Sequence, residues 1–206
     1  MHIAIVGAGN VGSALGGGWR KAGHQVSYAL RSRTSKNAER VSRDGFAILE
    51  MGEAAAKADT LLLALPWPIV ADALKSLGDL AGKTVIDATN PVTAELELAL
   101  GFDSSAGETV ARLAPGAHVV KAFNTTGAEN MAVASAFTQK PMMPVAGDDA
   151  AAKAKVVRLA ADLGFEAIDA GPLRAARLLE PMALFWIRQA YVQKMGRDFA
   201  FALARR

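Results

Sequence analysis

Three glycines near the N-terminus, Gly7, Gly9 and Gly12, have the spacing G-x-G-x-x-G. They follow an apolar run at 2–6 and precede a segment with helical character. In this setting Gly7 permits a tight turn, Gly9 lets the backbone approach a pyrophosphate, and Gly12 lets the helix pack closely on the sheet. Phosphates would lie at the helix N-terminus, where free N–H groups and the helix dipole favour negative charge. The sequence therefore predicts a dinucleotide site at 7–12.

The end of the second predicted strand indicates which dinucleotide binds. Sites that prefer NAD place an Asp or Glu there to bind the ribose 2′-hydroxyl. This chain has no carboxylate at that point and carries Arg31, Ser32 and Arg33 instead. Guanidinium groups suit bidentate contacts with phosphate, and Lys36 adds a further donor. The segment favours NADP(H), and a solvated turn of the same composition is the alternative.

Leu65, Pro66 and Trp67 lie at the carboxyl end of the apolar run at 60–65, a run typical of a central parallel strand. The prolines end the strand because they cannot extend its ladder of hydrogen bonds. Ligands bind at the carboxyl ends of strands in such sheets. These three residues are therefore candidates for a wall of the nicotinamide site, with simple packing of Trp67 as the alternative.

Two asparagines, Asn90 and Asn124, also fall at the carboxyl ends of predicted strands, and Pro91 follows the first of them. An amide at such a position can hydrogen-bond to ribose or to the nicotinamide carboxamide. It can equally cap a turn. We include Asn90, Pro91 and Asn124 among the candidate cofactor-binding residues.

Strand and helix patterns alternate along most of the chain, which indicates βαβ crossovers. We therefore expect an α/β fold: a Rossmann-like doubly wound parallel sheet in a single domain with a long C-terminal helix. The predicted strands lie at 2–6, 25–30, 46–49, 60–65, 84–87, 118–122, 142–146 and 165–169. The predicted helices before the C-terminal one lie at 10–22, 34–44, 53–58, 69–77, 104–114 and 150–163.

The C-terminal part, 173–206, extends the NADP-binding part at 1–172 within the same domain. One long helix is predicted at 173–195, with Pro181 near a kink or in an early turn. Its apolar stripe contains Leu178, Met182, Phe185, Trp186, Val192 and Met195. Because a small domain has few places to bury this stripe, we expect a homodimer built on the helix. Alternating apolar residues at 199–203 slightly favour a short terminal strand over a continued helix.

The composition excludes several classes of protein. The 206 residues carry a net charge of only +3, which gives little support to nucleic-acid binding. There is no cysteine, so disulfides, thiolate nucleophiles and cysteine-ligated metals are excluded. The three histidines lack the spacing of metal ligands, and no metal site is expected. With no signal peptide and no apolar run long enough for a membrane span, we expect a cytoplasmic protein.

Several segments together resemble the family of NADP oxidoreductases that use the deazaflavin coenzyme F420, over nearly the whole chain. The segments are 7–12, 24–31, 65–67, 146–149, 169–173 and 176–180. The last three are the more specific, because nothing generic to dinucleotide binding requires them. Two further segments, 87–91 and 121–125, are more similar to a bacterial set of dinucleotide-binding enzymes and to the cytosolic domain of six-transmembrane ferric reductases, which pass hydride from NADPH to a flavin.

The resemblance implies NADP(H) on the glycine loop and a second redox cofactor, F420, FMN or FAD, facing the nicotinamide. It places Arg31 and Ser32 at the 2′-phosphate. The residues that it places at the pyrophosphate are Ala8, Gly9, Asn10 and Val11; those that border the ribose or nicotinamide are Leu65, Asn90 and Ala128. Relatives that use deazaflavin carry a histidine where this chain has Asn124, so the acceptor stays open.

We therefore expect an oxidoreductase that transfers hydride between NADP(H) and deazaflavin or flavin. Such transfer needs alignment and exclusion of water rather than an acid or base, and no catalytic residue is expected. A non-catalytic NADP(H)-binding sensor is the alternative. A small-molecule dehydrogenase is a weaker one, for which Lys121 is the only candidate proton donor.

Overall fold

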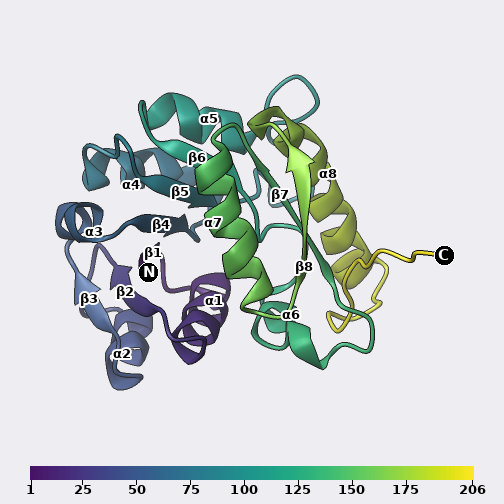
Figure 1. Ribbon diagram of the computed structural model, residues 1–206, viewed down its shortest axis with the longest axis horizontal. Coiled ribbons are helices and arrows are strands. Elements are labelled where there is room, and N and C mark those ends of the chain that lie inside the picture. The colour runs from purple at the N-terminus through teal and green to yellow at the C-terminus, as the bar shows by residue number, and fades with distance from the viewer.

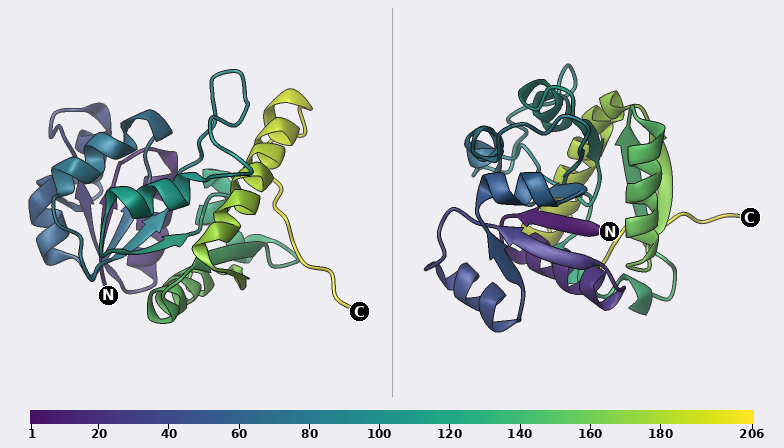
Figure 2. Two further views of the ribbon diagram at one scale, coloured as in Figure 1. Left: turned by 90° about the horizontal axis from the view of Figure 1, so that it is seen from above. Right: turned by 60° about the vertical axis from the view of Figure 1, so that its left-hand side comes forward.

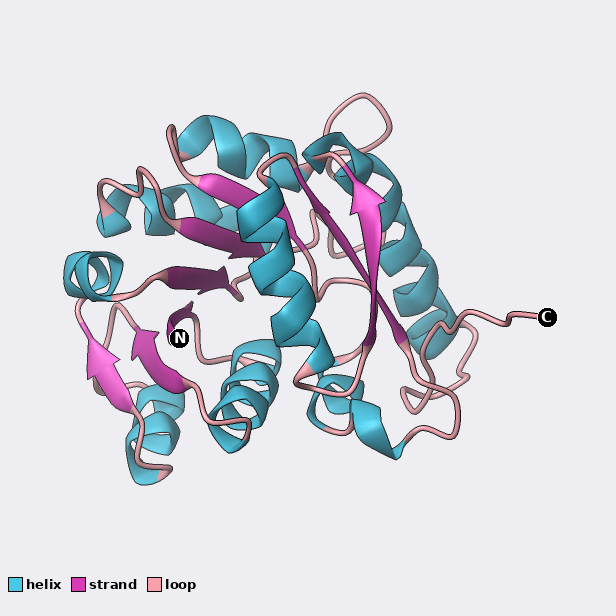
Figure 3. Cartoon of the chain, viewed as in Figure 1, coloured by secondary structure: helices cyan, strands magenta, loops and turns pink.

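The apolar runs between turn residues form one eight-stranded sheet with helices on both faces, in a computed structural model that describes residues 1–206 (Figure 1 and Figure 3). The strand order is β3-β2-β1-β4-β5-β6-β7-β8. The strands are β1 (His2–Val6), β2 (Gln25–Ala29), β3 (Ala47–Leu49), β4 (Thr60–Leu63), β5 (Thr84–Asp87), β6 (His118–Lys121), β7 (Met142–Gly147) and β8 (Glu166–Gly171). The Rossmann-like α/β fold is thus confirmed.

Helices follow the strands as the alternating pattern predicts. The α-helices are α1 (Asn10–Lys21), α2 (Lys36–Arg43), α3 (Met51–Lys57), α4 (Val70–Leu77), α5 (Ala106–Leu113), α6 (Ala128–Ala132), α7 (Ala150–Ala161) and α8 (Ala176–Ile187). Three short 3₁₀ turns are η1 (Trp67–Ile69), η2 (Ala134–Ala136) and η3 (Leu173–Ala175), and α8 continues into a π-helical turn, η4 (Arg188–Val192).

The central strands are buried on both faces. In β1, Ile3 and Ile5 pack into one apolar cluster with Trp19, whereas the alternate residues Ala4 and Val6 pack into a second cluster on the other face. This is why β1 reads as a continuous apolar run rather than an alternating one. The chain passes from β1 to β2 on one side and returns to pair β4 on the other. Ligands bind at such a switch point, outside the carboxyl ends of the strands.

The direction of β7 and β8 differs from the prediction. Val120 and Lys121 pair with Gly147 and Ala146 in an antiparallel ladder, and β8 is parallel to β7. An all-parallel sheet is therefore wrong for these two strands. The connection between β6 and β7 contains only the five-residue α6 and the three-residue η2. Neither is long enough to carry the chain back to the amino-terminal end of β6. β7 therefore starts past the carboxyl end of β6 and runs back in the opposite direction.

The predicted helix at 173–195 is confirmed in outline as the succession η3, α8 and η4, with Pro181 inside α8. The predicted strand at 199–203 is wrong, because the residues after η4 form neither strand nor helix. Their aromatic rings pack on α8, and the Phe199 ring stacks on Trp186 with centroids 5.2 Å apart. The Phe201 carbonyl oxygen accepts from the N–H of Met142 in β7 at 2.8 Å, but no strand forms. Figure 2 shows the end of this tail, in yellow, extending away from α8 to the C-terminus.

None of the helices combines the length and the apolarity that a membrane-spanning helix needs.

Candidate functional site

The glycine loop joins β1 to α1, and its three glycines meet different surroundings. Gly7 has φ +109°, and a Cβ there would lie 2.4 Å from the carbonyl oxygen of Ala64. A Cβ on Gly12 would lie 2.2 Å from the Gly7 carbonyl oxygen. At Gly9 a Cβ would meet no protein atom within 4 Å. The fold itself therefore requires Gly7 and Gly12, whereas Gly9 leaves open space above the loop.

The N-terminus of α1 faces this space without a protein partner. Its N-cap is Gly9, which supplies no side-chain hydrogen bond, and its first turn contains no acidic residue. The first N–H groups of a helix have no acceptors within the helix. Together with the bare Gly9, these groups form a cradle that suits a pyrophosphate, and this fits the predicted dinucleotide.

Two side chains hold the loop from behind. The Arg40 Nη2 donates to the carbonyl oxygen of Ala8 at 2.6 Å and to Ser13 Oγ at 2.7 Å. The Tyr28 hydroxyl donates to the carbonyl oxygen of Gly12 at 2.9 Å. Burial raises the pKa of Tyr28 to about 12, so its hydroxyl remains a donor at neutral pH. These contacts fix the loop before any ligand binds.

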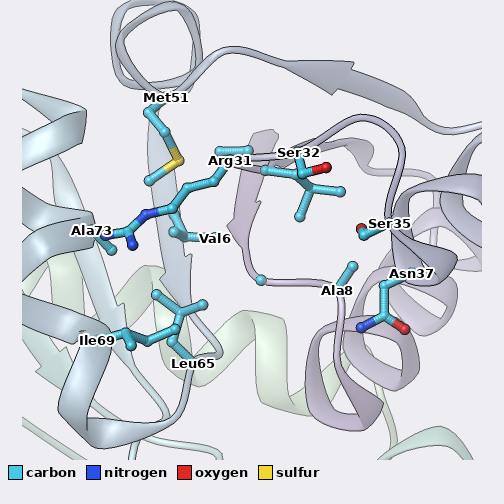
Figure 4. Close-up of a pocket in the computed structure, with 13 residues that line it drawn as sticks. Val6, Ala8, Arg31, Ser32, Ser35, Asn37, Met51, Leu65, Ile69 and Ala73 are labelled. Atoms are coloured by element: carbon cyan, nitrogen blue, oxygen red, sulfur yellow. The ribbon is translucent and has the colours of Figure 1, made fainter.

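A hollow of about 230 Å³ opens beside the loop, at the carboxyl ends of β1 and β2 (Figure 4). Apolar side chains form most of its lining, and no carboxylate contributes. The lining residues are Val6, Gly7, Ala8, Ala29, Leu30, Arg31, Ser32, Ser35, Asn37, Met51, Leu65, Ile69 and Ala73. An apolar pocket with a few polar groups is the usual form of a ligand site.

The polar groups of the hollow lie at two ends. Arg31 extends towards Ala73, whereas Ser32, Ser35 and Asn37 gather at the other end (Figure 4). The nearest carboxylate to Arg31 is that of Asp72, at 3.9 Å on the exposed surface. At this distance the guanidinium is not neutralised by a close ion pair and is free to turn towards an anion.

The N-terminus of α2 lies at the end of the hollow where the two serines gather. Ser35 is the N-cap of α2, and its Oγ accepts from the N–H of Ala38 at 3.2 Å. Two other predicted phosphate ligands do not line the hollow. Lys36 is the exposed first residue of α2, and Arg33 Nε donates to Glu50 Oε1 at 3.1 Å. Of the basic residues predicted at the 2′-phosphate, only Arg31 is therefore placed at the hollow.

The segment after β4 only partly enters the hollow. Leu65 lines it, and a Cβ on Gly7 would lie 2.8 Å from the Leu65 Cδ2. Pro66 is the exposed N-cap of η1, and the half-buried Trp67 packs against the apolar cluster on that face of the sheet. The structure thus places Leu65 at the hollow and packs Trp67 against this cluster, and the role of Trp67 as a wall of the nicotinamide site stays a prediction.

Asn90 and Asn124 form an amide pair at the carboxyl ends of β5 and β6. Asn90 Nδ2 donates to the carbonyl oxygen of Asn124 at 3.0 Å, and Asn124 Nδ2 donates to Asn90 Oδ1 at 3.1 Å. Asn124 Nδ2 also donates to the carbonyl oxygen of Leu179 on α8 at 3.0 Å. Asn90 is half-buried, and Pro91 beside it is buried. These residues lie together but outside the hollow beside the loop.

Asn10 and Ala128 meet across a second hollow, of about 360 Å³, at the N-termini of α1 and α6. Arg40 and Arg197 also line it, and Arg197 forms an ion pair with Glu129 at 2.7 Å. Most of the cofactor-binding residues predicted from the sequence therefore fall into three groups: the loop with its hollow, the amide pair, and this second hollow. Four of them belong to none of these groups and line neither hollow: Arg33, Lys36, Pro66 and Trp67.

Lys121 is fully buried at the end of β6. Its Nζ lies 2.9 Å from Asp87 Oδ2 and 2.9 Å from Glu180 Oε1, and it donates to the carbonyl oxygen of Thr89 at 2.6 Å. The two carboxylates are fully buried as well. An ammonium group has three hydrogens to donate, and all three have acceptors here. This arrangement leaves no hydrogen of Lys121 for a substrate.

Arg177 is also engaged within the protein. Its Nε and Nη2 donate to the two carboxylate oxygens of Glu108, each at 2.8 Å. This contact holds the pKa of Glu108 below its ordinary value. With Glu180, Arg177 attaches α8 to α5, which gives a structural reason for the specific motif at 176–180.

Sequence reasoning missed Ser35 and Asn37 in the hollow. A signal for Ser35 was present, because Ser before a polar helix is a typical N-cap. Met51, Ile69 and Ala73 carry no local signal, since their place beside the loop depends on how α3, η1 and α4 pack. The buried partner of Lys121, Glu180, is distant in the sequence and equally invisible there.

Known proteins that are similar to this chain include proteins described as NADP-dependent reductases. Residues 2–91 match the model of a family described as coenzyme F420-dependent NADP oxidoreductase. A predicted F420-dependent NADP reductase from Arthrobacter sp. FB24 is 29% identical, with a TM-score of 0.90 over 98% of this chain and 99% of that chain. A hypothetical protein, SMa0349 from Sinorhizobium meliloti, is 30% identical, with a TM-score of 0.72 over 85% of this chain and 87% of that chain.

One curated relative is the metalloreductase STEAP3 of Rattus norvegicus, which is 29% identical over 183 residues. The match covers 88% of this chain but only 36% of the relative. The chain thus spans about a third of that protein's length. These matches confirm the resemblance that the sequence motifs indicate.

Proposed function

Because residues 2–91 of this chain match the model of the family of coenzyme F420-dependent NADP oxidoreductases, we propose that the protein is an NADP(H)-dependent oxidoreductase whose hydride acceptor is a deazaflavin or a flavin. The observation that carries the donor assignment is the lining of the hollow. It contains Arg31 and the polar side chains of Ser32, Ser35 and Asn37, and no carboxylate. A carboxylate would repel a 2′-phosphate, whereas these groups donate to one.

Each part of the site has a separate task in binding NADP(H). The N–H groups at the start of α1 bind the pyrophosphate above Gly9. Arg31, Ser32 and Ser35 bind the 2′-phosphate, and the apolar lining covers the adenosine. The Leu65 side chain and the Asn90 amide border the nicotinamide half. Bound NADPH supplies a hydride, with two electrons, and leaves as NADP⁺.

The burial of Lys121 supports a ring cofactor as the acceptor. Reduction of a carbonyl compound needs a proton donor at the reacting oxygen. Lys121 was the only candidate donor, and its three hydrogens are bonded to Asp87, Glu180 and Thr89. A flavin or deazaflavin that takes up hydride can obtain its accompanying proton from water. Alignment of two rings is then what the protein must provide.

The experiment that tests this proposal follows NADPH oxidation by the purified protein at 340 nm. Oxidised F420, FMN and FAD are supplied separately, and F420 reduction is followed by loss of its own absorbance. We expect turnover with at least one of them and little with NADH. Tight NADPH binding without turnover on any acceptor would contradict the enzyme and favour the alternative, a non-catalytic NADP(H)-binding sensor.

We also propose that two copies associate through α8. Leu178, Phe185 and Val192 are seven residues apart and all exposed, with 72% of Leu178 accessible. In a regular α-helix residues at this spacing share one face, as Leu178 and Phe185 do in α8, and Val192 lies in the π-helical turn η4 that continues it. Exposed apolar patches commonly mark interaction surfaces. A second copy of the same face would cover this stripe.

Sedimentation velocity tests the dimer. The wild-type protein should sediment as a dimer, and Leu178→Glu should sediment as a monomer because it buries a charge against the partner's apolar face. Leu113→Glu places the same charge at an exposed leucine on α5 and should leave the dimer intact. A monomeric wild-type protein would contradict the proposal.

A further inference from the structure

We propose that Asn124 is a positioning residue: it does not touch the nucleotide but fixes the amide of Asn90, which does. This inference rests on the proposed NADP(H) site and assigns separate roles to two residues that the sequence treats alike. It follows from the orientation of two side-chain amides, the backbone before Asn124 and the buried charges behind Asn90.

The hydrogen bonds leave one orientation for each amide. Asn124 Nδ2 has two acceptors, Asn90 Oδ1 and the Leu179 carbonyl oxygen. Turning the amide over would set its oxygen against both of them. The Asn124 Oδ1 has no partner and is sealed from the surface, and only 4% of the residue is exposed. Asn124 thus offers no polar atom at the surface.

Asn90 is the member of the pair that reaches the surface. It is half-buried, and its Nδ2 donates to the main-chain oxygen of Asn124. Its Oδ1 accepts from the side chain of the same residue. Because one Nδ2 hydrogen and one lone pair of Oδ1 are used in this way, the remaining hydrogen and lone pair have fixed directions. A donor or acceptor on a ligand would meet a preoriented amide.

The backbone before Asn124 is held in an unusual conformation. Phe123 has φ +59°, in the left-handed region that bulky residues rarely adopt. Its ring is fully buried, with centroid distances of 5.5 Å to Trp19 and 6.5 Å to Phe165. Its N–H points at Met143 Sδ, 3.1 Å away. The core thus holds the turn out of β6 that brings Asn124 to Asn90.

The turn that carries Asn90 is fixed from behind by buried charges. Asp87 Oδ1 accepts from the N–H and the hydroxyl of Thr89, at 2.9 and 2.7 Å. Lys121 Nζ donates to the Thr89 carbonyl oxygen at 2.6 Å. Glu180 joins this cluster to α5 by accepting from the N–H groups of Ala106 and Gly107. Both main-chain groups of Thr89, its N–H and its carbonyl oxygen, are therefore held by hydrogen bonds directly before Asn90.

Comparing the binding of two ligands, NADPH and 2′,5′-ADP, distinguishes the positioning role of Asn124 from a general effect on the fold. NADPH carries both halves of the dinucleotide, whereas 2′,5′-ADP carries only the adenosine half, with its 2′-phosphate and 5′-phosphate, and lacks the nicotinamide half. Dissociation constants are measured by calorimetry for both ligands, on the wild type, Asn90→Ala, Asn124→Leu and the double variant. Asn37→Ala, an identical truncation in the adenosine hollow, is the matched control.

We expect Asn90→Ala and Asn124→Leu each to weaken NADPH binding about tenfold, the loss of one hydrogen bond to a ligand. Binding of 2′,5′-ADP should stay within about twofold of wild type, whereas Asn37→Ala should weaken both ligands alike. The double variant should bind NADPH as weakly as Asn90→Ala alone, because both changes remove the same contact.

Three results would overturn the inference. Additive losses in the double variant would show that Asn124 contacts the nucleotide itself. Unchanged NADPH binding in Asn90→Ala, the half-buried position that tolerates truncation best, would show that Asn90 is no ligand. Equal losses for NADPH and 2′,5′-ADP would show a general effect on the fold. A wild-type protein that fails to bind 2′,5′-ADP would instead contradict the proposed NADP(H) site.

Discussion

Gly9→Val should weaken NADPH binding by about a hundredfold or more, an effect of roughly 3 kcal/mol, without unfolding the protein. Gly9 has extended backbone angles, φ −73° and ψ −168°, which valine adopts readily. A Cβ there meets no protein atom within 4 Å, so the fold has room for the side chain. The same space is where the pyrophosphate is proposed to lie, and the valine would occupy it.

Two further glycine variants make this result interpretable. Gly17→Val introduces the same side chain on α1, also with no protein atom within 4 Å of the new Cβ, and should bind NADPH normally. Gly7→Val should destabilise the fold, because its Cβ would lie 2.4 Å from a carbonyl oxygen. Calorimetry and thermal unfolding on the three variants separate binding from stability. Normal NADPH binding by a folded Gly9→Val would show that the loop does not cradle the pyrophosphate.

Arg31→Ala should weaken NADPH binding about thirtyfold and NADH binding by about twofold or less. A charge-assisted hydrogen bond contributes about 1.5–3 kcal/mol, and only NADPH carries the 2′-phosphate that accepts it. Arg31 lines the hollow and has no carboxylate closer than that of Asp72, at 3.9 Å. Dissociation constants for both nucleotides, measured on wild type and variant, give the ratio directly.

Arg33→Ala is the matched control for Arg31. It removes the same side chain two residues away, where the guanidinium is already bonded to Glu50 at 3.1 Å and does not line the hollow. NADPH binding should change by less than about threefold, in line with the small contribution of exposed ion pairs. A larger loss for Arg33→Ala than for Arg31→Ala would reverse the assignment of the phosphate ligand.

The glycine loop could be predicted from the sequence because its requirements are local. A buried strand, a turn and a helix follow one another within 2–21. Gly12 meets atoms of this unit and Gly9 meets open space, whereas the close neighbour of Gly7, Ala64, comes from the segment after β4. Arg31 could also be predicted from local sequence, since it lies two residues after the end of β2. The residues that complete the hollow, such as Met51 and Ala73, come from helices whose packing no short segment specifies.

The direction of β7 could not be predicted from its own residues. Its apolar run is compatible with either direction, and what decides the direction is the short connection from β6, which lacks a full crossover helix. The strand predicted at 199–203 is wrong for a related reason, because contacts with a distant element decide the conformation. Its alternating aromatic residues match a strand, yet Phe199 and Phe201 stack on Trp186 and Phe185 of α8.

Lys121 shows the limit of reasoning about single residues. A lysine at the carboxyl end of a central strand is a reasonable candidate proton donor, and nothing nearby in the chain argues otherwise. Its three acceptors come from β5, the turn after β5, and α8, and they are separated from it by 32 to 59 positions. Only the assembled fold shows that its hydrogens are all used.

The most direct test of the account is the relative affinity of the wild-type protein for NADPH and NADH, measured by isothermal titration calorimetry in one buffer. The two nucleotides differ only in the 2′-phosphate, the group for which Arg31, Ser32 and Ser35 are the proposed ligands. We predict that NADPH binds at least about tenfold more tightly than NADH. Equal affinity for the two, or a preference for NADH, would contradict the account.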